Sequence, residues 1–283
     1  MISEKLLNIW LQLKSFVRFV FHVKPNLKKP KAVNNYKITF SDFFIGHNLD
    51  ENKWSISQPW GDFHPDYLHQ YYGKDESFVS VENGCLNLYS RYKPKKFYDF
   101  KKNINIVIPY GVGLIVSKST FKYGYYEING ILPTGKLLWP AIWLTAEKTW
   151  PPEIDIVEAY SGKRSDYSNQ FGIPFVKFQP NIHYGFVEDK TKASYGAKDY
   201  PIPFKPSQRS VTYAVHWTEK FIKFYYDGYL VFQTEKKEIL DYFNKEGVNM
   251  NIILNNAYHP DVDGTKYDPS IFKINYVKFF AKN

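Results

Sequence analysis

The stretch WPPEIDIVE, residues 150–158, places three carboxylates within six positions of an otherwise apolar run. Its segment EIDIVE has the length of a strand. It is preceded by a Pro-Pro pair and followed by a Ser-Gly turn. Successive side chains of a β-strand point to opposite faces, so Glu153 and Asp155 share one face while Ile154 and Ile156 share the other. The stretch therefore predicts a strand with an acidic face and an apolar face.

Glu158 has the wrong parity for this strand. In a regular strand it would point into the apolar face, where an unpaired carboxylate is costly. A β-bulge at Ile156 and Val157 adds one residue, keeps both apolar side chains inward and returns Glu158 to the acidic face. The spacing of the acids therefore predicts a bulge at these two residues.

Paired carboxylates on one face suit glycoside hydrolysis. In a bulged strand the Cα atoms of Glu153 and Glu158 lie roughly 13 Å apart, about four steps of about 3.3 Å, and long side chains can shorten that separation. Retaining glycosidases hold two carboxyl groups about 5–5.5 Å apart, one as nucleophile and one as proton donor. Asp155 between them would hydrogen-bond the nucleophile and keep the charges unequal. A solvated edge strand with a chance cluster of acids is the alternative for an isolated motif.

Segments on both sides of this strand carry a resemblance to a known family. They are FSDFF and LDENKW between residues 40 and 54, NGCLNLYS at 83–90, FKYGYYEINGILPTG at 121–135, WPAIWLTAEKTWPPEIDIVE at 139–158, NIHYG at 181–185, YAVHWTEKFIKFYYDG at 213–228 and FKINYVKFF at 272–280. In order and spacing they resemble glycoside hydrolase family 16, from about Thr39 to the C-terminus.

The resemblance implies an all-β fold, a β-jelly-roll sandwich of two antiparallel sheets (concanavalin A-like) with an open concave cleft. It implies endo-acting hydrolysis of a β-linked polysaccharide, a β-1,3-glucan or β-galactan, with retention through a glycosyl-enzyme. By position, Glu153 resembles the nucleophile, Asp155 the assisting acid and Glu158 the general acid/base. The two residues between Asp155 and Glu158 resemble the bulged branch of laminarinases, agarases, carrageenases and porphyranases.

Two alternatives stay open on the same scaffold. A glycosyl-enzyme can be intercepted by a sugar as well as by water, so a transglycosylase is one. A non-catalytic glycan-binding protein is the other, although binding would not require all three acids. The intact acid set favours an enzyme over a binding protein and leaves hydrolysis and transglycosylation open.

Aromatic and polar side chains near the acids are candidates for sugar binding. Aromatic faces stack on pyranose rings, and the family often carries a histidine at the position of the NIHYG segment. The alternative for each is structural packing. We expect substrate-binding roles for Trp139, Trp143, Trp150, His183, Trp60 and Asn255. Asn255 opens the segment NNAYHP, which departs from the usual glucanase pattern and leaves laminarin specificity open.

The remaining pattern predicts antiparallel strands. Alternating apolar runs at 220–226 and 229–234 flank Asp227-Gly228, a type I′ hairpin signal. Further runs typical of strands lie at 84–90, 104–108, 112–118, 121–131, 137–145, 209–217, 248–254 and 271–280. Aromatic residues make up 19% of the chain, which favours strands over helices.

The N-terminus differs from the rest. Residues 2–23 place apolar side chains on one helical face and polar ones on the other, which predicts an amphipathic helix. Lys14 and Arg18 interrupt its apolar core, so it matches neither a cleavable signal peptide nor a spanning helix. Contact with a membrane surface and packing on protein are both open. We therefore divide the chain into residues 1–34, helix and basic linker, and 35–283, the catalytic sandwich.

The net charge of +9 raises the question of an anionic partner. No nucleic-acid motif accompanies it, so nucleic acid is not expected. The segment 91–102 is rich in lysine and is expected to be a loop between early strands at the cleft rim. Such a loop would attract a sulfated or uronic-acid glycan. A solvated loop that aids solubility is the alternative.

No cofactor is expected. The histidines are scattered without zinc-ligand spacing, and two glutamates need no metal. The single cysteine, Cys85, excludes an internal disulfide and is expected to pack as a small apolar side chain. A structural calcium, common in the family, is doubtful because Asn275 stands where an aspartate usually helps bind it. We expect a monomer, and the resemblance favours an extracellular or cell-envelope location.

Overall fold

The fold comes from a computed structural model of the chain. The structure describes residues 30, 33–58, 61–64, 66–100, 102–133, 135–146, 149–160, 176–185, 193–195, 200–202, 207 and 209–282. The predicted helix at 2–23 and Trp60 lie outside these residues. Within them, no helix is long and apolar enough to cross a membrane.

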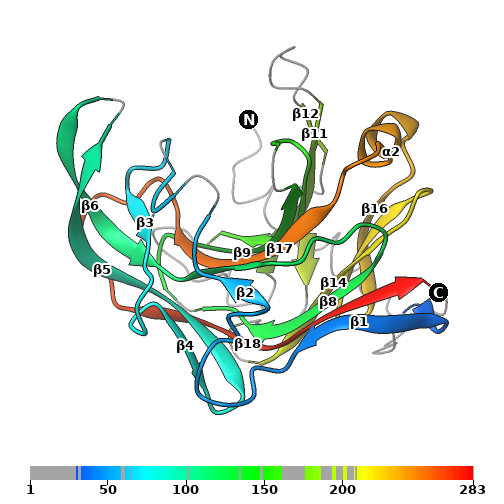
Figure 1. The fold of residues 1–283 in the computed structure, drawn as a ribbon, viewed down its shortest axis with the longest axis horizontal. Coiled ribbons are helices and arrows are strands. Elements are labelled where there is room, and N and C mark those ends of the chain that lie inside the picture. The colour runs from blue at the N-terminus through cyan, green and yellow to red at the C-terminus, as the bar shows by residue number, and fades with distance from the viewer. Residues whose placement is uncertain are drawn as a thin grey trace, which may run out of the picture.

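Two packed sheets form the fold, as the sequence predicts (Figure 1). The ten-stranded sheet has the order β16-β15-β14-β8-β18-β5-β6-β3, with β1 on β18 and β4 on β5. Its strands are β1 Tyr36–Asp42, β3 Gln70–Tyr72, β4 Val79–Glu82, β5 Cys85–Asp99, β6 Ile104–Val112, β8 Gly124–Ile131, β14 Val211–Trp217, β15 Ile222–Tyr226, β16 Tyr229–Thr234 and β18 Ser270–Lys282.

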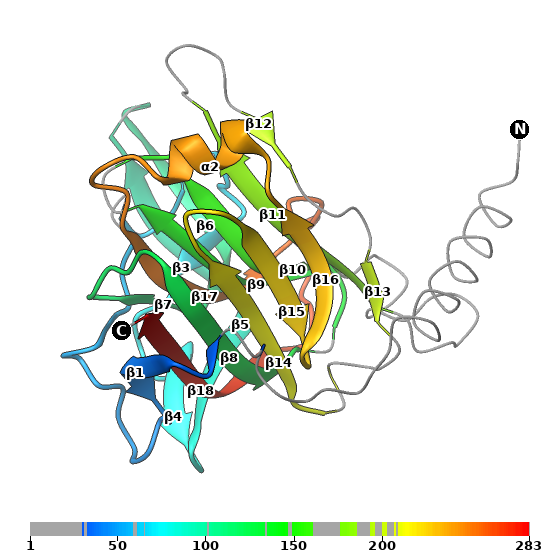
Figure 2. The ribbon, with the colours of Figure 1, turned by 90° about the vertical axis from the view of Figure 1, so that its right-hand side faces the viewer.

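The eight-stranded sheet has the order β12-β11-β10-β9-β17-β7-β2, with β13 on β11. Its strands are β2 Trp54–Ser55, β7 Leu114–Ser117, β9 Leu138–Ala146, β10 Glu153–Ala159, β11 Val176–Tyr184, β12 Ala193–Ser194, β13 Tyr200–Ile202 and β17 Met250–Tyr258. Antiparallel pairing prevails in both sheets, and β3 with β6 is a parallel pair. The helix α2, Lys237–Phe243, lies at one end of the sandwich beside β11 (Figure 2).

The core lies between the sheets and is rich in aromatic side chains. Alternation along each strand sends every second side chain inward, and β-branched and aromatic residues pack well on a pleated surface. The largest fully buried side chains of this core are Trp54, Trp217, Tyr126, Tyr213, Tyr226, Phe78, Phe224 and Phe243, while Tyr110, Tyr125 and Tyr258 belong to smaller buried clusters. The sheet that carries the acids is thus backed by a solid core.

The predicted hairpin turn is confirmed. Asp227 and Gly228 have φ of 48° and 79°, as a type I′ turn requires of both central residues. The Asp227 carboxylate accepts hydrogen bonds from the Thr212 N–H at 2.8 Å and from the Arg209 guanidinium at 2.6 Å. These bonds fix the turn between β15 and β16 onto the neighbouring strand β14.

The prediction of a lysine-rich loop at 91–102 is wrong. Strand β5 continues to Asp99 and pairs with β6, and the two strands form a hairpin that projects at one edge of the molecule (Figure 1). The side chains of Lys95 and Phe97, two residues apart, lie on the same face of β5 against Tyr71. The Phe97 ring packs 5.2 Å from the Tyr71 ring, and the Lys95 ammonium lies 5.6 Å from the Tyr71 ring centre. Lysine stems cover apolar surface while their charged ends stay in water.

Cys85 is half-buried, and its thiol donates to Asn275 Oδ1 at 3.2 Å, so it has a polar partner that the sequence did not predict. The Asn275 amide nitrogen donates to Asn129 Oδ1 at 2.6 Å and to Ser210 Oγ at 2.8 Å. With its donors and its oxygen directed at neighbouring side chains, Asn275 does not fit a calcium ligand.

One buried side chain ties the two sheets together. Asn256 in β17 is fully buried, and its Nδ2 donates to Leu88 O on β5 at 3.0 Å and to Ser270 O on β18 at 3.3 Å. Both acceptors belong to the opposite sheet. Buried carbonyls that lose a donor are costly.

Asn256→Ala should therefore lower the free energy of unfolding by about 1–3 kcal/mol, because buried carbonyls lose their donor. Chemical denaturation measures this. The matched control is Asn249→Ala, on an exposed asparagine, which should stay within about 0.5 kcal/mol of wild type. Equal effects of the two substitutions would show that the bond between the sheets contributes nothing.

Candidate active site

Strand β10 carries the predicted bulge. On its β9 side, Asp155 pairs with Trp143 but Val157 pairs with Ile142, so two steps on β10 match one step on β9. On its β11 side a register shift also falls between Asp155 and Glu158. Ile156 and Val157 are both fully buried. The bulge and the inward direction of both apolar side chains are confirmed.

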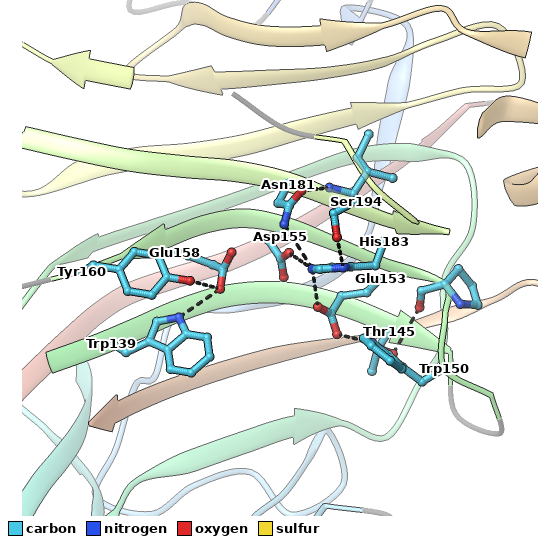
Figure 3. Close-up of polar contacts among 12 residues, drawn as sticks. Trp139, Thr145, Trp150, Glu153, Asp155, Glu158, Tyr160, Asn181, His183 and Ser194 are labelled. Carbon is cyan, nitrogen blue, oxygen red and sulfur yellow. Dashed lines mark hydrogen bonds and ion pairs between the residues drawn. The ribbon is translucent and has the colours of Figure 1, made fainter. Parts of the chain in front are cut away.

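The bulge brings the three acids to one face of the eight-stranded sheet (Figure 3). Asp155 is 3% exposed and Glu158 8% exposed, while Glu153 is half-buried. Desolvation disfavours the charged form of a carboxylate, so crowding three of them here requires specific partners.

Glu153 lies between a tryptophan and a histidine. Trp150 Nε1 donates to Glu153 Oε2 at 2.9 Å, and His183 Nε2 lies 3.4 Å from Glu153 Oε1. Burial, and then the charge of Asp155, raises the pKa of Glu153 well above its usual range, while His183 and the Trp150 N–H oppose that rise. Trp150 is 41% exposed, so its ring is accessible beside this carboxylate.

Asp155 is the most deeply buried of the acids. Its Oδ2 lies 3.4 Å from His183 Nε2 and has no hydrogen-bond donor among the described residues. Burial, and then the charge of Glu158, raises the pKa of Asp155 well above its usual range, while the neighbouring Glu153 carboxyl opposes that rise. The environment of Asp155 therefore favours its protonated form.

The His183 ring is positioned by its neighbours on β11 and β12. The Asn181 Oδ1 accepts the Ile182 N–H at 2.9 Å, which turns Asn181 Nδ2 toward His183 Nε2 at 3.1 Å. On the other side of the ring, Nδ1 lies 2.8 Å from Ser194 Oγ. Because Nε2 is 3.4 Å from both Glu153 Oε1 and Asp155 Oδ2, the ring lies between these two carboxyl groups.

Glu158 accepts two hydrogen bonds on one oxygen. Trp139 Nε1 donates to Glu158 Oε1 at 2.9 Å, and the Tyr160 hydroxyl donates to the same oxygen at 2.7 Å. Burial raises the pKa of Glu158, and the Tyr160 and Trp139 donors oppose the rise. Its second oxygen, Oε2, is thus the one left for a mobile proton.

An aromatic cluster surrounds the Glu158 end of the site. The rings of Trp139 and Tyr160 stack with centroids 5.4 Å apart, Tyr67 meets Trp139 edge-on at 6.0 Å, and His259 meets Tyr160 edge-on at 5.9 Å. Sequence reasoning did not identify Tyr67, Tyr160 or His259. Tyr67 and His259 lie far from the three acids in the chain, whereas Tyr160 follows Glu158 by two residues, and that spacing could have pointed to it.

The structure gathers most of the predicted sugar-binding residues here. Trp139, Trp150 and His183 contact the acids directly. Trp143, on β9, pairs with Asp155 across the strands. Trp143 Nε1 donates to Asn255 Oδ1 at 2.7 Å, and Asn255 lies on the neighbouring strand β17 of the same sheet. The ligand atoms of Glu153, Asp155 and His183 lie within 4.8 Å of one another and could touch one metal ion, although no metal was expected.

Comparisons with known proteins agree on one family. Residues 74–278 match the model described as glycosyl hydrolases family 16. The chain is 24% identical over 311 residues to glucan endo-1,3-beta-glucosidase A1 of Niallia circulans, covering 95% of this chain and 43% of that protein. It is 29% identical over 192 residues to a glucan endo-1,3-beta-glucosidase of Cryptopygus antarcticus, covering 60% of this chain and 66% of that protein. The chain thus spans less than half of the first of these relatives.

Solved structures show the same fold. LamAcat from Zobellia galactanivorans aligns with a TM-score of 0.70 at 21% identity, covering 89% of this chain and 100% of that one. A structure reported with endo-acting O-glycanases of the human gut microbiota that initiate mucin breakdown aligns with a TM-score of 0.71 at 24% identity, covering 88% and 92%.

The raised pKa of Asp155 has a consequence for stability. Between its unfolded value, about 3.9, and its folded value, the folded state binds more protons than the unfolded state, so the free energy of unfolding falls as the pH rises through this window. Asp155→Asn removes the ionisable group and should stabilise the protein at pH 7 by about 0.5–2 kcal/mol, as relief of a functional site often does.

Denaturant titrations of wild type and Asp155→Asn at pH 4 and pH 7 measure this, and the variant should lose less stability over that interval. Glu246→Gln, on an exposed glutamate, should follow wild type. A variant less stable than wild type at pH 7 would contradict the predicted protonation.

Proposed function

The chain belongs to glycosyl hydrolases family 16, and we propose that it is an endo-acting glycosidase that cleaves a β-linked glucan with retention of the anomeric configuration. The observation that carries the proposal is the gathering of Glu153, Asp155 and Glu158 on one face of β10, each with different partners. Two carboxyls with distinct environments are what a retaining mechanism needs.

The partners suggest how the roles divide. Close carboxyl groups disfavour one another's charged forms, and deep burial favours a protonated Asp155. The Trp150 N–H and His183 favour the charged form of Glu153, which suits a nucleophile. The pKa of Glu158 is raised by burial, which suits a general acid that must carry a proton near neutral pH.

The chemistry then proceeds in two steps. A Glu153 oxygen attacks the anomeric carbon while Glu158 gives its proton to the leaving glycosidic oxygen, so that a glycosyl ester forms on Glu153 and the bond to the leaving sugar breaks. Asp155 gives a hydrogen bond to Glu153 and limits charge repulsion at that carboxylate. Glu158, now ionised, takes a proton from a water that attacks the same carbon and frees the sugar.

The aromatic side chains divide between the two ends of this pair. The stacked Trp139 and Tyr160 lie beside Glu158, so we assign them to the sugar on the leaving-group side. Trp150 contacts Glu153 and is assigned to the sugar that becomes covalently bound. Trp143 and Asn255 would line the sheet between, and Trp60 stays a proposed contact.

For the substrate backbone we propose a β-1,3-glucan. The two relatives named glucan endo-1,3-beta-glucosidase match 95% and 60% of this chain. The bulged spacing of the acids supports placing the chain in the laminarinase-like branch of the family. Retention of all three acids favours hydrolysis over glycan binding alone.

Glu153→Ala and Glu158→Ala should each lower kcat on laminarin by about 10² to 10⁴-fold, since each removes the nucleophile or the proton donor. Added azide distinguishes the two roles. With an activated glycosyl substrate, Glu153→Ala should yield the azide of inverted configuration and Glu158→Ala that of retained configuration. Full activity of either variant would contradict its assignment.

The hairpin of β5 and β6 supports an anionic form of this substrate. Lys95 and Lys96 project from β5, and the aromatic Phe100 at the turn is 86% exposed. A positive arm rich in aromatic surface would attract a glycan that carries carboxylate or sulfate groups. The glucan would then be recognised by shape at the acids and by charge at this hairpin.

The double substitution of Lys95 and Lys96 by alanine should raise KM for a carboxylated glucan by about 3-fold or more at low ionic strength and by less in 0.5 M salt, because salt screens exposed charges. KM for neutral laminarin should not change. Alanine at Lys220 and Lys237, exposed lysines elsewhere, is the matched control. Equal KM values of the wild type for charged and neutral glucan would contradict the proposal that the substrate is anionic.

A further inference from the structure

The bulge in β10 leaves one peptide group without a neighbour in its own sheet. Ile156 has no partner in the register with β9, which passes from Asp155 to Val157. On the other side, the residue of β11 between the two paired positions Asn181 and Gln179 is Pro180. Proline has no N–H to donate. The Ile156 carbonyl therefore needs a donor from outside the sheet, since a buried carbonyl without one is costly.

The opposite sheet supplies that donor. The hydroxyl of Tyr226, at the end of β15, donates to Ile156 O at 2.9 Å, and both residues are fully buried. The bond crosses the core between the two sheets. It thus reaches the backbone directly behind the acidic face, where Asp155 and Glu158 flank the bulge.

Tyr226 is itself held in place. It directly precedes the turn residue Asp227, whose carboxylate accepts the Thr212 N–H at 2.8 Å and whose own N–H donates to Thr212 O at 2.7 Å. Its ring meets Tyr213 edge-on with centroids 5.5 Å apart. A side chain fixed at its base and along its ring can hold the peptide group at its tip.

We propose that Tyr226 is a positioning residue for catalysis, which fixes the bulge in β10 so that Glu158 reaches its hydrogen-bond donors and the substrate. The inference rests on the proposed function, because it assigns Glu158 to proton transfer. Without the hydroxyl, the Ile156 carbonyl would lack a donor, and its peptide group would rotate toward another one. The residues on both sides of Ile156 would then move. A misplacement of about 1 Å can lower a rate by about 10²-fold.

The experiment compares Tyr226→Phe with Tyr126→Phe. Tyr126 is also fully buried in the ten-stranded sheet, and its hydroxyl also donates to a backbone carbonyl, that of Lys122, away from β10. Both substitutions should lower Tm by a few degrees. Tyr226→Phe alone should lower kcat on laminarin by about 10- to 100-fold with little change in KM.

The pH profile gives a second readout that a structural role alone would not move. If Glu158 loses contact with Trp139 and Tyr160, its pKa rises, and the alkaline limb of kcat/KM should move to higher pH in Tyr226→Phe. The profile of Tyr126→Phe should match wild type. Equal kcat values and equal profiles in the two variants would overturn the proposal.

A readout without substrate separates this inference from the proposed function. Amide hydrogen exchange in the peptide that contains residues 153–159 should speed up in Tyr226→Phe and not in Tyr126→Phe. Unchanged exchange would overturn the proposal even if the enzyme is active, and faster exchange would support the anchor even if no glycan is cleaved.

Deletion of Val157 tests the link if Tyr226→Phe alone does not fold. Deletion removes the extra residue, so Glu158 regains the parity of Asp155 and Ile156 can pair in the sheet. In this background Tyr226→Phe should cause no further loss of Tm or protection. A loss as large as in the bulged chain would show that the hydroxyl does not act through the bulge.

Discussion

A strand that buries one face in an apolar core can present Glu153, Asp155 and Glu158 on the other face only if its alternation is broken once. Strand β10 does so at the fully buried Ile156 and Val157. This bulge leaves the Ile156 carbonyl outside the hydrogen-bond ladder of its own sheet. The hydroxyl of Tyr226, in the opposite sheet, donates a hydrogen bond to that carbonyl. The acidic face thus depends on the packing of the whole sandwich.

The same crowding sets the chemistry of the acids. Burial raises the pKa of all three carboxyls, and repulsion between the acids adds to the rise at Glu153 and Asp155. Tryptophan N–H groups donate to Glu153 and Glu158, whereas His183 Nε2 lies 3.4 Å from Asp155 Oδ2. Such a site lowers stability in return for carboxyls that differ in protonation at one pH.

Local rules predicted the parts of the fold and site that lie within one strand or turn. The parity of WPPEIDIVE required the bulge, and Asp227-Gly228 required its turn, because both follow from backbone geometry alone. The lysine-rich part of β5 was expected to be a loop, since its charges hide the contact of Phe97 with Tyr71 that packs the strand. The bond from Tyr226 to Ile156 joins segments 70 residues apart, and no spacing in the sequence encodes it.

The proposed mechanism depends on a covalent bond between Glu153 and the sugar. In a 2-deoxy-2-fluoro-β-laminaribiosyl fluoride, the 2-fluoro group slows both chemical steps, and the fluoride leaving group keeps formation of the glycosyl-enzyme faster than its release. The glycosyl-enzyme therefore accumulates, and mass spectrometry of its peptides locates the ester. We expect a single adduct on Glu153 and none on Glu158. An adduct on another residue, or turnover of laminarin with inversion at the anomeric carbon, would contradict it.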